Sequence, residues 1–133
     1  MPQNQTTGAA ANKYGRETAQ LVAATLGTKL AGTRSNEAEL HGRRVVIKCA
    51  RLKTSSVGVT YEMQKTLDEV LGAFEIEPGK YEVFALPIET FIKCQRPSRS
   101  QGQSAHKVGL VSRSEFVKNG KFLSSLFLPR SDA

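Results

Sequence analysis

The sequence predicts an α/β fold in which a β-sheet is flanked by helices. Runs of β-branched and apolar residues predict strands, the two strongest over residues 43–51 and 81–88. Apolar residues at helical spacing predict helices over residues 14–26 and 61–74. With 133 residues, the chain fits one domain with a core of modest size.

The N-terminal part of the chain divides into a tail and a helix. Residues 1–13 are polar and carry little apolar bulk, so we expect a disordered tail there and a single domain over residues 14–133. The helix over 14–26 ends at Gly27. Glu17, near the start of this helix, either reaches the edge of a site or stays solvated and complements the helix dipole.

A β-hairpin follows, with strands over residues 36–40 and 43–51 joined by His41–Gly42. Alternation in the second strand divides its side chains between two faces. One face carries Val45, Ile47 and Cys49, and the other carries Arg44, Val46, Lys48 and Ala50. Because small and apolar side chains surround Lys48, we expect the face that carries it to be covered rather than open to water.

The remaining elements complete an order that we interpret as an αβββαβ core. They are a loop over 52–59, a helix over 61–74 capped by Thr60, strands over 81–88 and 108–111, and a short helix from Ser112 to Asn119. The basic segment over 93–107 is too long for a simple connection, so it is either functional or disordered. The C-terminal segment KFLSSLFLP is apolar enough to pack on the domain or on a second subunit.

The composition favours a polyanionic partner. The net charge of +7 and the isoelectric point near 9.7 favour nucleic acid first and an acidic membrane surface second, although such a charge also serves solubility alone. No apolar run is long enough to span a membrane, and the N-terminus lacks the apolar region of a signal peptide, so we expect a cytoplasmic protein. Cys49 and Cys94 lack a zinc-binding spacing and are expected to be buried free thiols.

Lys48 is the residue around which we expect a site. A lysine within an apolar strand is costly to bury unless carboxylates meet its ammonium group. Glu39 ends the neighbouring hairpin strand, and Glu62 opens the following helix. Carboxylates that bind a divalent cation, with a lysine beside the attacking water, suit the hydrolysis of a phosphodiester. The alternative is that Lys48 forms a buried ion pair with Glu39 or Glu62 and does nothing more.

This arrangement resembles the PD-(D/E)xK superfamily, the restriction-endonuclease-like fold, over roughly residues 14–90. The resemblance implies an αβββαβ core, a mixed central sheet flanked by helices, and cleavage of DNA that depends on Mg²⁺ or Mn²⁺. Glu39 takes the place of the first acid, with Glu37 as the alternative, Val46-Ile47-Lys48 takes the place of (D/E)xK, and Glu17 takes that of a glutamate in the first helix.

The chain departs from the family pattern at the second acid, where it has Val46. A subgroup of restriction enzymes carries this acid in the next helix, with thirteen residues between the lysine and the glutamate. Glu62 has this spacing from Lys48. The resemblance therefore implies Glu39, Glu62 and Glu17 as ligands of the metal ion, with Lys48 at the attacking water.

Two groups of basic residues are expected to contact phosphates and base edges. The first comprises Arg34, Arg43, Arg44, Arg51 and Lys53, and the second comprises Arg96, Arg99, His106, Lys107 and Arg113. Taken singly, each is a solvated surface charge. Together with the net charge they favour nucleic acid, and DNA rather than RNA.

Three functions compete. The first is a small metal-dependent endonuclease that hydrolyses DNA and is expected to act as a homodimer in order to reach both strands. The second is a nucleic-acid-binding module on the same fold whose catalytic set has eroded, as Val46 allows. The third is an interaction protein that docks onto a larger assembly through its basic segment and its apolar C-terminus.

Overall fold

A computed structural model of the protein describes residues 2–32, 35–98 and 107–128, with side chains from residue 13 onward. The elements are, in order, α1 (Pro2–Thr25), β1 (Glu37–Leu40), β2 (Arg43–Ala50), β3 (Ser56–Thr60), α2 (Tyr61–Gln64), β4 (Glu69–Glu77), β5 (Lys80–Pro87), α3 (Ile88–Cys94), β6 (Arg96–Pro97), β7 (Val108–Ser112), α4 (Arg113–Asn119) and β8 (Lys121–Phe127).

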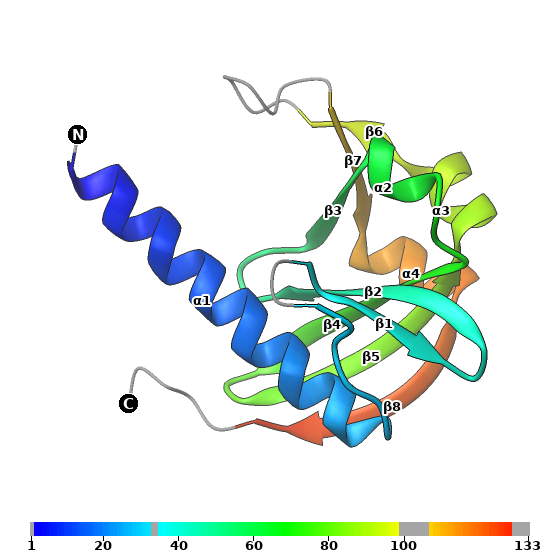
Figure 1. Cartoon of the computed structure of the whole chain (residues 1–133), viewed down its shortest axis with the longest axis horizontal. Helices are drawn as coiled ribbons and strands as arrows, with labels where there is room; N and C mark the ends of the chain where they lie inside the picture. The colour runs from blue at the N-terminus through cyan, green and yellow to red at the C-terminus, as the bar shows by residue number, and fades with distance from the viewer. Residues whose placement is uncertain (1, 33–34, 99–106, 129–133) are drawn as a thin grey trace.

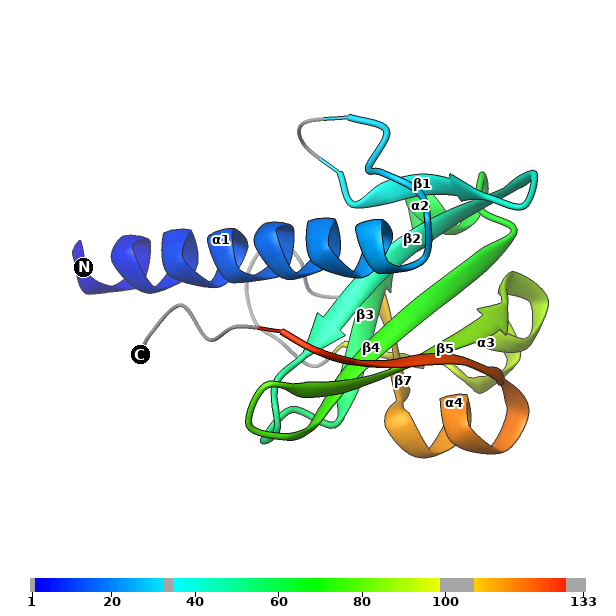
Figure 2. The same cartoon turned by 90° about the horizontal axis from the view of Figure 1, so that it is seen from below.

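The central sheet has five strands in the order β1-β2-β4-β5-β8. Strand β2 pairs with β4 in parallel, and the other neighbouring strands of this sheet pair antiparallel, so the sheet is mixed. Helix α1 covers one face, whereas α3, α4 and a small sheet of order β3-β7-β6 lie on the other (Figures 1 and 2). The predicted fold class, a mixed central sheet flanked by helices, is confirmed.

The two faces of strand β2 belong to two separate cores. Val45, Ile47 and Cys49 pack in the core under α1, whereas Val46 and Ala50 belong to the core under the small sheet, α3 and α4. The alternation predicted for this strand is therefore confirmed. It follows that Lys48, between Val46 and Ala50 in the alternation, lies on the face turned away from α1.

The hairpin formed by β1 and β2 is confirmed, together with its turn. His41 has a φ of 53° and Gly42 a φ of 78°, so both central residues adopt the left-handed conformation. Two such residues in succession match the right-handed twist of the flanking strands and make a tight connection. This connection fixes which residues of β1 and β2 lie opposite each other.

Helix α1 ends at Thr25, and Gly27 follows with a φ of 84°, as the predicted stop requires. The helix begins at Pro2 and thus includes most of the segment over 1–13, for which a disordered tail was expected. In Figures 1 and 2 its N-terminal half projects beyond the sheet. The single-domain organisation over 14–133 stays a prediction.

The helix predicted over residues 61–74 is wrong. Helix α2 makes one turn, and the chain then enters β4 in the middle of the central sheet. Thr60 caps α2 as predicted, because its hydroxyl oxygen accepts a hydrogen bond from the backbone N–H of Met63 at 3.1 Å. The apolar residues assigned to one helix face are instead divided between the two faces of β4, both of which are buried.

The loop predicted over 52–59 contains strand β3, which belongs to the small sheet. The buried side chain of Gln64 ties α2 to this sheet by donating hydrogen bonds to the Val59 carbonyl at 3.1 Å and to Gln95 Oε1 at 2.7 Å. Strands β5 and β7 and helix α4 lie where they were predicted. The apolar C-terminal segment packs on the domain as strand β8, antiparallel to β5.

The two cysteines are free thiols and are half-buried. Burial raises the pKa of the Cys49 thiol to about 12. In the described part of the chain, no helix is long and apolar enough to cross a membrane. Of the basic segment predicted to be functional or disordered, residues 99–106 lie outside the described residues.

Candidate functional site

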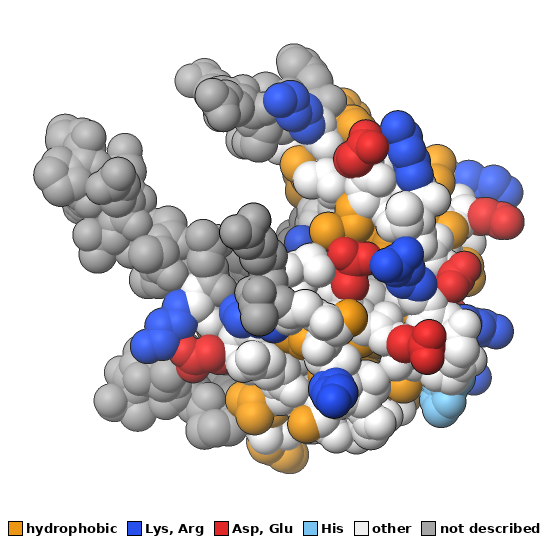
Figure 3. Space-filling model, viewed as in Figure 1, with side chains coloured by type: hydrophobic (Ala, Val, Ile, Leu, Met, Phe, Trp, Pro, Cys, Tyr) orange, Lys and Arg blue, Asp and Glu red, His pale blue; other side chains and the backbone are white. Residues whose placement is uncertain are grey.

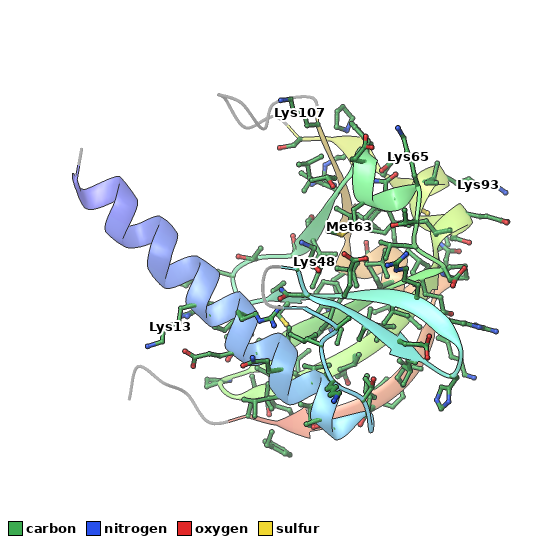
Figure 4. All side chains as sticks on the ribbon, in the orientation of Figure 1. Lys13, Lys48, Met63, Lys65, Lys93 and Lys107 are labelled. Carbon is green, nitrogen blue, oxygen red and sulfur yellow. The ribbon has the colours of Figure 1, made fainter. Side chains whose placement is uncertain are left out.

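Lys48 lies on β2 opposite Gly72 of β4, on the face of the central sheet that carries the small sheet. Its neighbours on this face include Val46, Val70 and Phe74, which are at most 1% exposed. The lysine side chain is half-buried, and Figure 4 shows its position on the sheet. Because burial removes water from the ammonium group, it lowers the pKa of Lys48 below its usual range.

The Lys48 ammonium group has no hydrogen-bond or ion-pair partner among the described residues. The predicted alternative, a buried ion pair with Glu39 or Glu62, is not found there. An unpaired cation next to an apolar core is uncommon, because burial of a charge is costly unless a counter-charge meets it. As far as the described residues go, the Lys48 ammonium group is available to the charge of a ligand.

Two predicted metal ligands, Glu39 and Glu62, lie away from Lys48. Glu39 is exposed and faces Arg44 across the hairpin. Arg44 precedes Lys48 by four residues on β2, a separation of roughly 13 Å along a strand. Glu62 is exposed, and its carboxylate pairs at 3.3 Å with Lys65, which lies well apart from Lys48 in Figure 4.

The third predicted ligand, Glu17, lies on α1 and pairs with Lys13 at 3.7 Å. Helix α1 packs on the face of the central sheet opposite the one that carries Lys48. The described structure therefore does not bring Glu17, Glu39 and Glu62 together.

Glu37, the alternative first acid, is the hairpin carboxylate nearest to Lys48 in register. Its Cα partner on β2 is Val46, so it shares a face with Lys48 and is a diagonal neighbour. Its carboxylate is turned toward Arg44, whose Nε lies 3.5 Å away. The two-residue turn of the hairpin already fixes this register, so the sequence contained the signal that favours Glu37 over the acid two residues later.

The described side chains around Lys48 do not fit a divalent cation. In the described part of the chain, no group of three or more His, Cys, Asp or Glu side chains could hold a metal ion. Where the PD-(D/E)xK pattern has its second acid, Val46 is fully buried in an apolar core. Glu37 thus stands beside Lys48 without the second carboxylate that the resemblance requires, and the geometry supports no metal-dependent step.

Three of the predicted nucleic-acid contacts already have carboxylate partners. Arg43 pairs with Glu69 at 3.0 Å, Arg44 with Glu37 at 3.5 Å, and Arg113 with Glu82 at 3.5 Å. Their charges are thereby partly compensated on the surface. The predicted contacts Arg34 and Arg99 lie outside the described residues.

The first predicted basic group is also not one cluster. Arg43 opens β2 and Lys53 follows its other end, so these two residues flank a strand of eight residues, which spans roughly 26 Å. Within this group, only Arg51 and Lys53 follow the C-terminal end of β2. The charge expected to converge on one site is therefore divided between two ends of the sheet.

The remaining cations gather around a hollow. In Figure 3 the surface beside the small sheet is hollowed, and Figure 4 shows Lys48 near the small sheet and Lys107 at the end of that sheet. The loop that carries Arg51 and Lys53 joins the strand of Lys48 to β3. We call this region, defined by Lys48, Lys53 and Lys107, the Lys48 hollow. Among the described residues, none of these three forms an ion pair.

A tyrosine pair holds Arg51 on the face of the central sheet that α1 covers, opposite the face that carries Lys48. The hydroxyl groups of Tyr14 and Tyr81 share a hydrogen bond of 2.5 Å, and the guanidinium carbon of Arg51 lies 4.0 Å from the centre of the Tyr14 ring. This cation–π contact holds Arg51 against α1. Burial, followed by the contact with Tyr81, raises the pKa of Tyr14 above its usual range. The sequence predicted Tyr14 only as part of the apolar face of a helix. Its contacts with Tyr81 and Arg51 could not be predicted from the sequence.

Comparison with known proteins finds only a weak structural similarity to a solved structure. No family profile and no curated protein matches the sequence. Among solved structures, the chain is similar to Hjc, a Holliday junction resolvase from the archaeal hyperthermophile Archaeoglobus fulgidus. The match covers 85% of this chain and 92% of the resolvase, with 11% sequence identity and a TM-score of 0.44. A TM-score this low does not establish a common fold, and such an identity transfers no activity.

Proposed function

We propose that this protein binds nucleic acid at the Lys48 hollow, with DNA as the first partner to test. The observation that carries the proposal is the half-buried Lys48 ammonium group, which has no partner among the described residues. A phosphate oxygen would supply the missing counter-charge. Because the ammonium group is already partly stripped of water, a charge-assisted contact there is stronger than one made by a lysine in bulk solvent.

The surroundings of Lys48 support the same proposal. Lys53 and Lys107 carry charges that no described carboxylate compensates. The whole chain carries a net charge of +7. Contacts to the phosphate backbone dominate the affinity of such proteins and make it fall steeply as salt is added. They also position the protein without reading sequence.

Metal-dependent hydrolysis of DNA is the second candidate, and the observation in its favour is Glu37 beside Lys48. Against it stand the fully buried Val46 and the separation of Glu17, Glu39 and Glu62 described above. Binding without metal-dependent hydrolysis, on a fold whose catalytic set has eroded, therefore fits the side chains better.

One experiment separates these candidates. The full chain is incubated with supercoiled plasmid and Mg²⁺ or Mn²⁺, and its binding to a labelled duplex is followed by fluorescence anisotropy as salt increases. We expect salt-sensitive binding and no nicking of the plasmid. If the unaltered protein nicks the plasmid and the K48A variant does not, metal-dependent hydrolysis becomes the better-supported function. Failure to bind any nucleic acid at low salt would overturn both candidates and favour an interaction protein.

A further inference from the structure

The Lys48 hollow holds an amine whose environment suits covalent chemistry that needs no metal ion. We propose that Lys48 forms an imine with the aldehyde of a ring-opened abasic sugar and thereby cleaves the nucleic-acid strand at that sugar. This activity rests on the proposed binding of nucleic acid. It uses the one group of the predicted catalytic set that is placed for chemistry and requires none of the separated carboxylates.

The first argument is the state of the amine. An amine attacks a carbonyl carbon only when it is neutral, and lysines that form imines are activated by removal from water. Lys48 stands among Val46, Val70 and Phe74, which exclude water from its stem. No described carboxylate holds its proton, since Glu37 is turned toward Arg44. Burial lowers the pKa of Lys48, so more of it is neutral than of an ordinary lysine at the same pH.

The second argument is the class of substrate. An abasic nucleotide keeps its phosphates but has no base, so its sugar can turn out of the helix at less cost than that of an intact nucleotide. The Lys48 side chain is half-buried but not sealed from solvent, so an aldehyde can reach its amine. Lys53 and Lys107 are exposed cations available to the flanking phosphates.

The reaction balances without an oxidant, a reductant or a metal. Neutral Nζ of Lys48 adds to C1′ of the aldehyde, and loss of one water gives the imine. The imine makes the C2′ proton acidic. A base from the solvent takes this proton, the C–H electron pair forms the C2′–C3′ double bond, and the C3′–O bond breaks with the phosphate as leaving group. Addition of one water to the imine then releases Lys48 and an unsaturated aldehyde.

The test traps the imine in the unaltered protein. The full chain is mixed with a duplex that carries one abasic site, sodium borohydride reduces the imine to a stable amine, and peptide mass spectrometry locates the attached lysine. Binding of the same duplex is measured in parallel by anisotropy. We expect a covalent adduct on Lys48. The yield per bound complex should fall by about tenfold or more in K48R, equivalent to roughly 1.4 kcal/mol in activation free energy, and should be unchanged in K93R.

The outcomes separate this activity from binding itself. If the duplex binds but no adduct forms, or if the adduct is located on other lysines, the imine chemistry is overturned and the binding function stands. If the duplex does not bind, both are overturned. Because the attached lysine is identified in the unaltered chain, the result holds even if K48R fails to fold, and the exposed Lys93 provides a matched lysine-to-arginine control.

Discussion

Two charged residues of the central sheet, Glu75 and Lys48, differ in whether the protein supplies hydrogen-bond partners for their charged groups. Glu75 is 7% exposed, and its two carboxylate oxygens accept hydrogen bonds from the backbone N–H groups of Leu52 at 3.1 Å and Gly79 at 2.9 Å. Lys48 has no such partner in the described part of the chain. A charge whose hydrogen bonds are satisfied within the protein supports the fold, whereas one left unpaired is available to a ligand.

The satisfied carboxylate predicts a specific loss of stability. E75Q replaces one acceptor oxygen by an amide group that only donates, so the N–H of Leu52 or Gly79 loses its partner. We expect the free energy of unfolding to fall by about 2 kcal/mol. Urea denaturation measures it, with E77Q as control because Glu77 is exposed near the hairpin end. Equal stability of the two variants would contradict the role given to Glu75.

The unpaired ammonium predicts the opposite effect. K48M removes a charge that burial destabilises, so it should raise the free energy of unfolding at neutral pH by roughly 1 kcal/mol. Burial lowers the pKa of Lys48 from its ordinary value of 10.5. The unfolded chain thus binds this proton more tightly, and the stability of the unaltered protein rises as pH increases from the lowered pKa toward 10.5.

The advantage of K48M should therefore shrink over that range of pH. Urea denaturation of both proteins at a series of pH values checks this, and a constant difference would contradict the assignment. The other ionisable groups near Lys48 are Cys49 on the same strand and Glu37 on β1. Both are kept in the two proteins. Burial raises the pKa of the Cys49 thiol and the charge of Lys48 lowers it, so part of the difference in pH dependence belongs to this pair.

Single residues of the site were predictable to different degrees. Alternation along β2 predicted the covered surroundings of Lys48, because neighbours in a strand decide them. The partners of Lys48 were not predictable, because they depend on elements far away in sequence. Glu62 was chosen for a helix that has only one turn in the structure, and its carboxylate is exposed and paired with Lys65.

At the scale of elements, β4 decides the architecture of the sheet. It lies between β2 and β5, parallel to one and antiparallel to the other. Its apolar residues serve both cores, so its sequence has neither the alternation of a half-buried strand nor an exposed polar face. A short apolar run of this kind cannot be assigned to a helix or a strand by periodicity. The hairpin, β5, β7 and α4 were predictable because local turn and capping residues mark them.

The assignment of β4 as a strand can be tested with one methyl group. A Cβ atom at Gly72 would lie 2.6 Å from Phe74 Cε2 and 3.0 Å from Phe116 Cε2, in a fully buried part of the sheet. We expect G72A to lower the free energy of unfolding by roughly 1–3 kcal/mol. In the helix predicted from sequence, the same change would have stabilised the protein by about 1 kcal/mol. Thermal or urea unfolding gives the sign directly.

At the scale of the whole molecule, the arrangement of charge matters more than its sum. Arg43 and Arg113 are paired with carboxylates, whereas Lys48, Lys53 and Lys107 are not, within the described residues. Composition predicted a basic protein and a polyanionic partner, but it could not predict which cations would be compensated. The homodimer stays a prediction, and light scattering on the full chain in solution would measure its mass.

The central claim is that nucleic acid binds at the Lys48 hollow, and the dependence of DNA affinity on salt tests it most directly. Lys107 lies on the side of the small sheet next to this hollow, and Lys93 lies on a different side of the molecule (Figure 4). K107Q and K93Q each remove one positive charge, so they differ only in position.

Equilibrium binding of a labelled duplex is measured at several salt concentrations for the unaltered protein and both variants. We predict that K107Q weakens binding and reduces the slope of log affinity against log salt by about one, as the loss of one phosphate contact requires. K93Q should leave both unchanged. Equal effects of the two variants, or affinity that does not depend on salt, would contradict the claim.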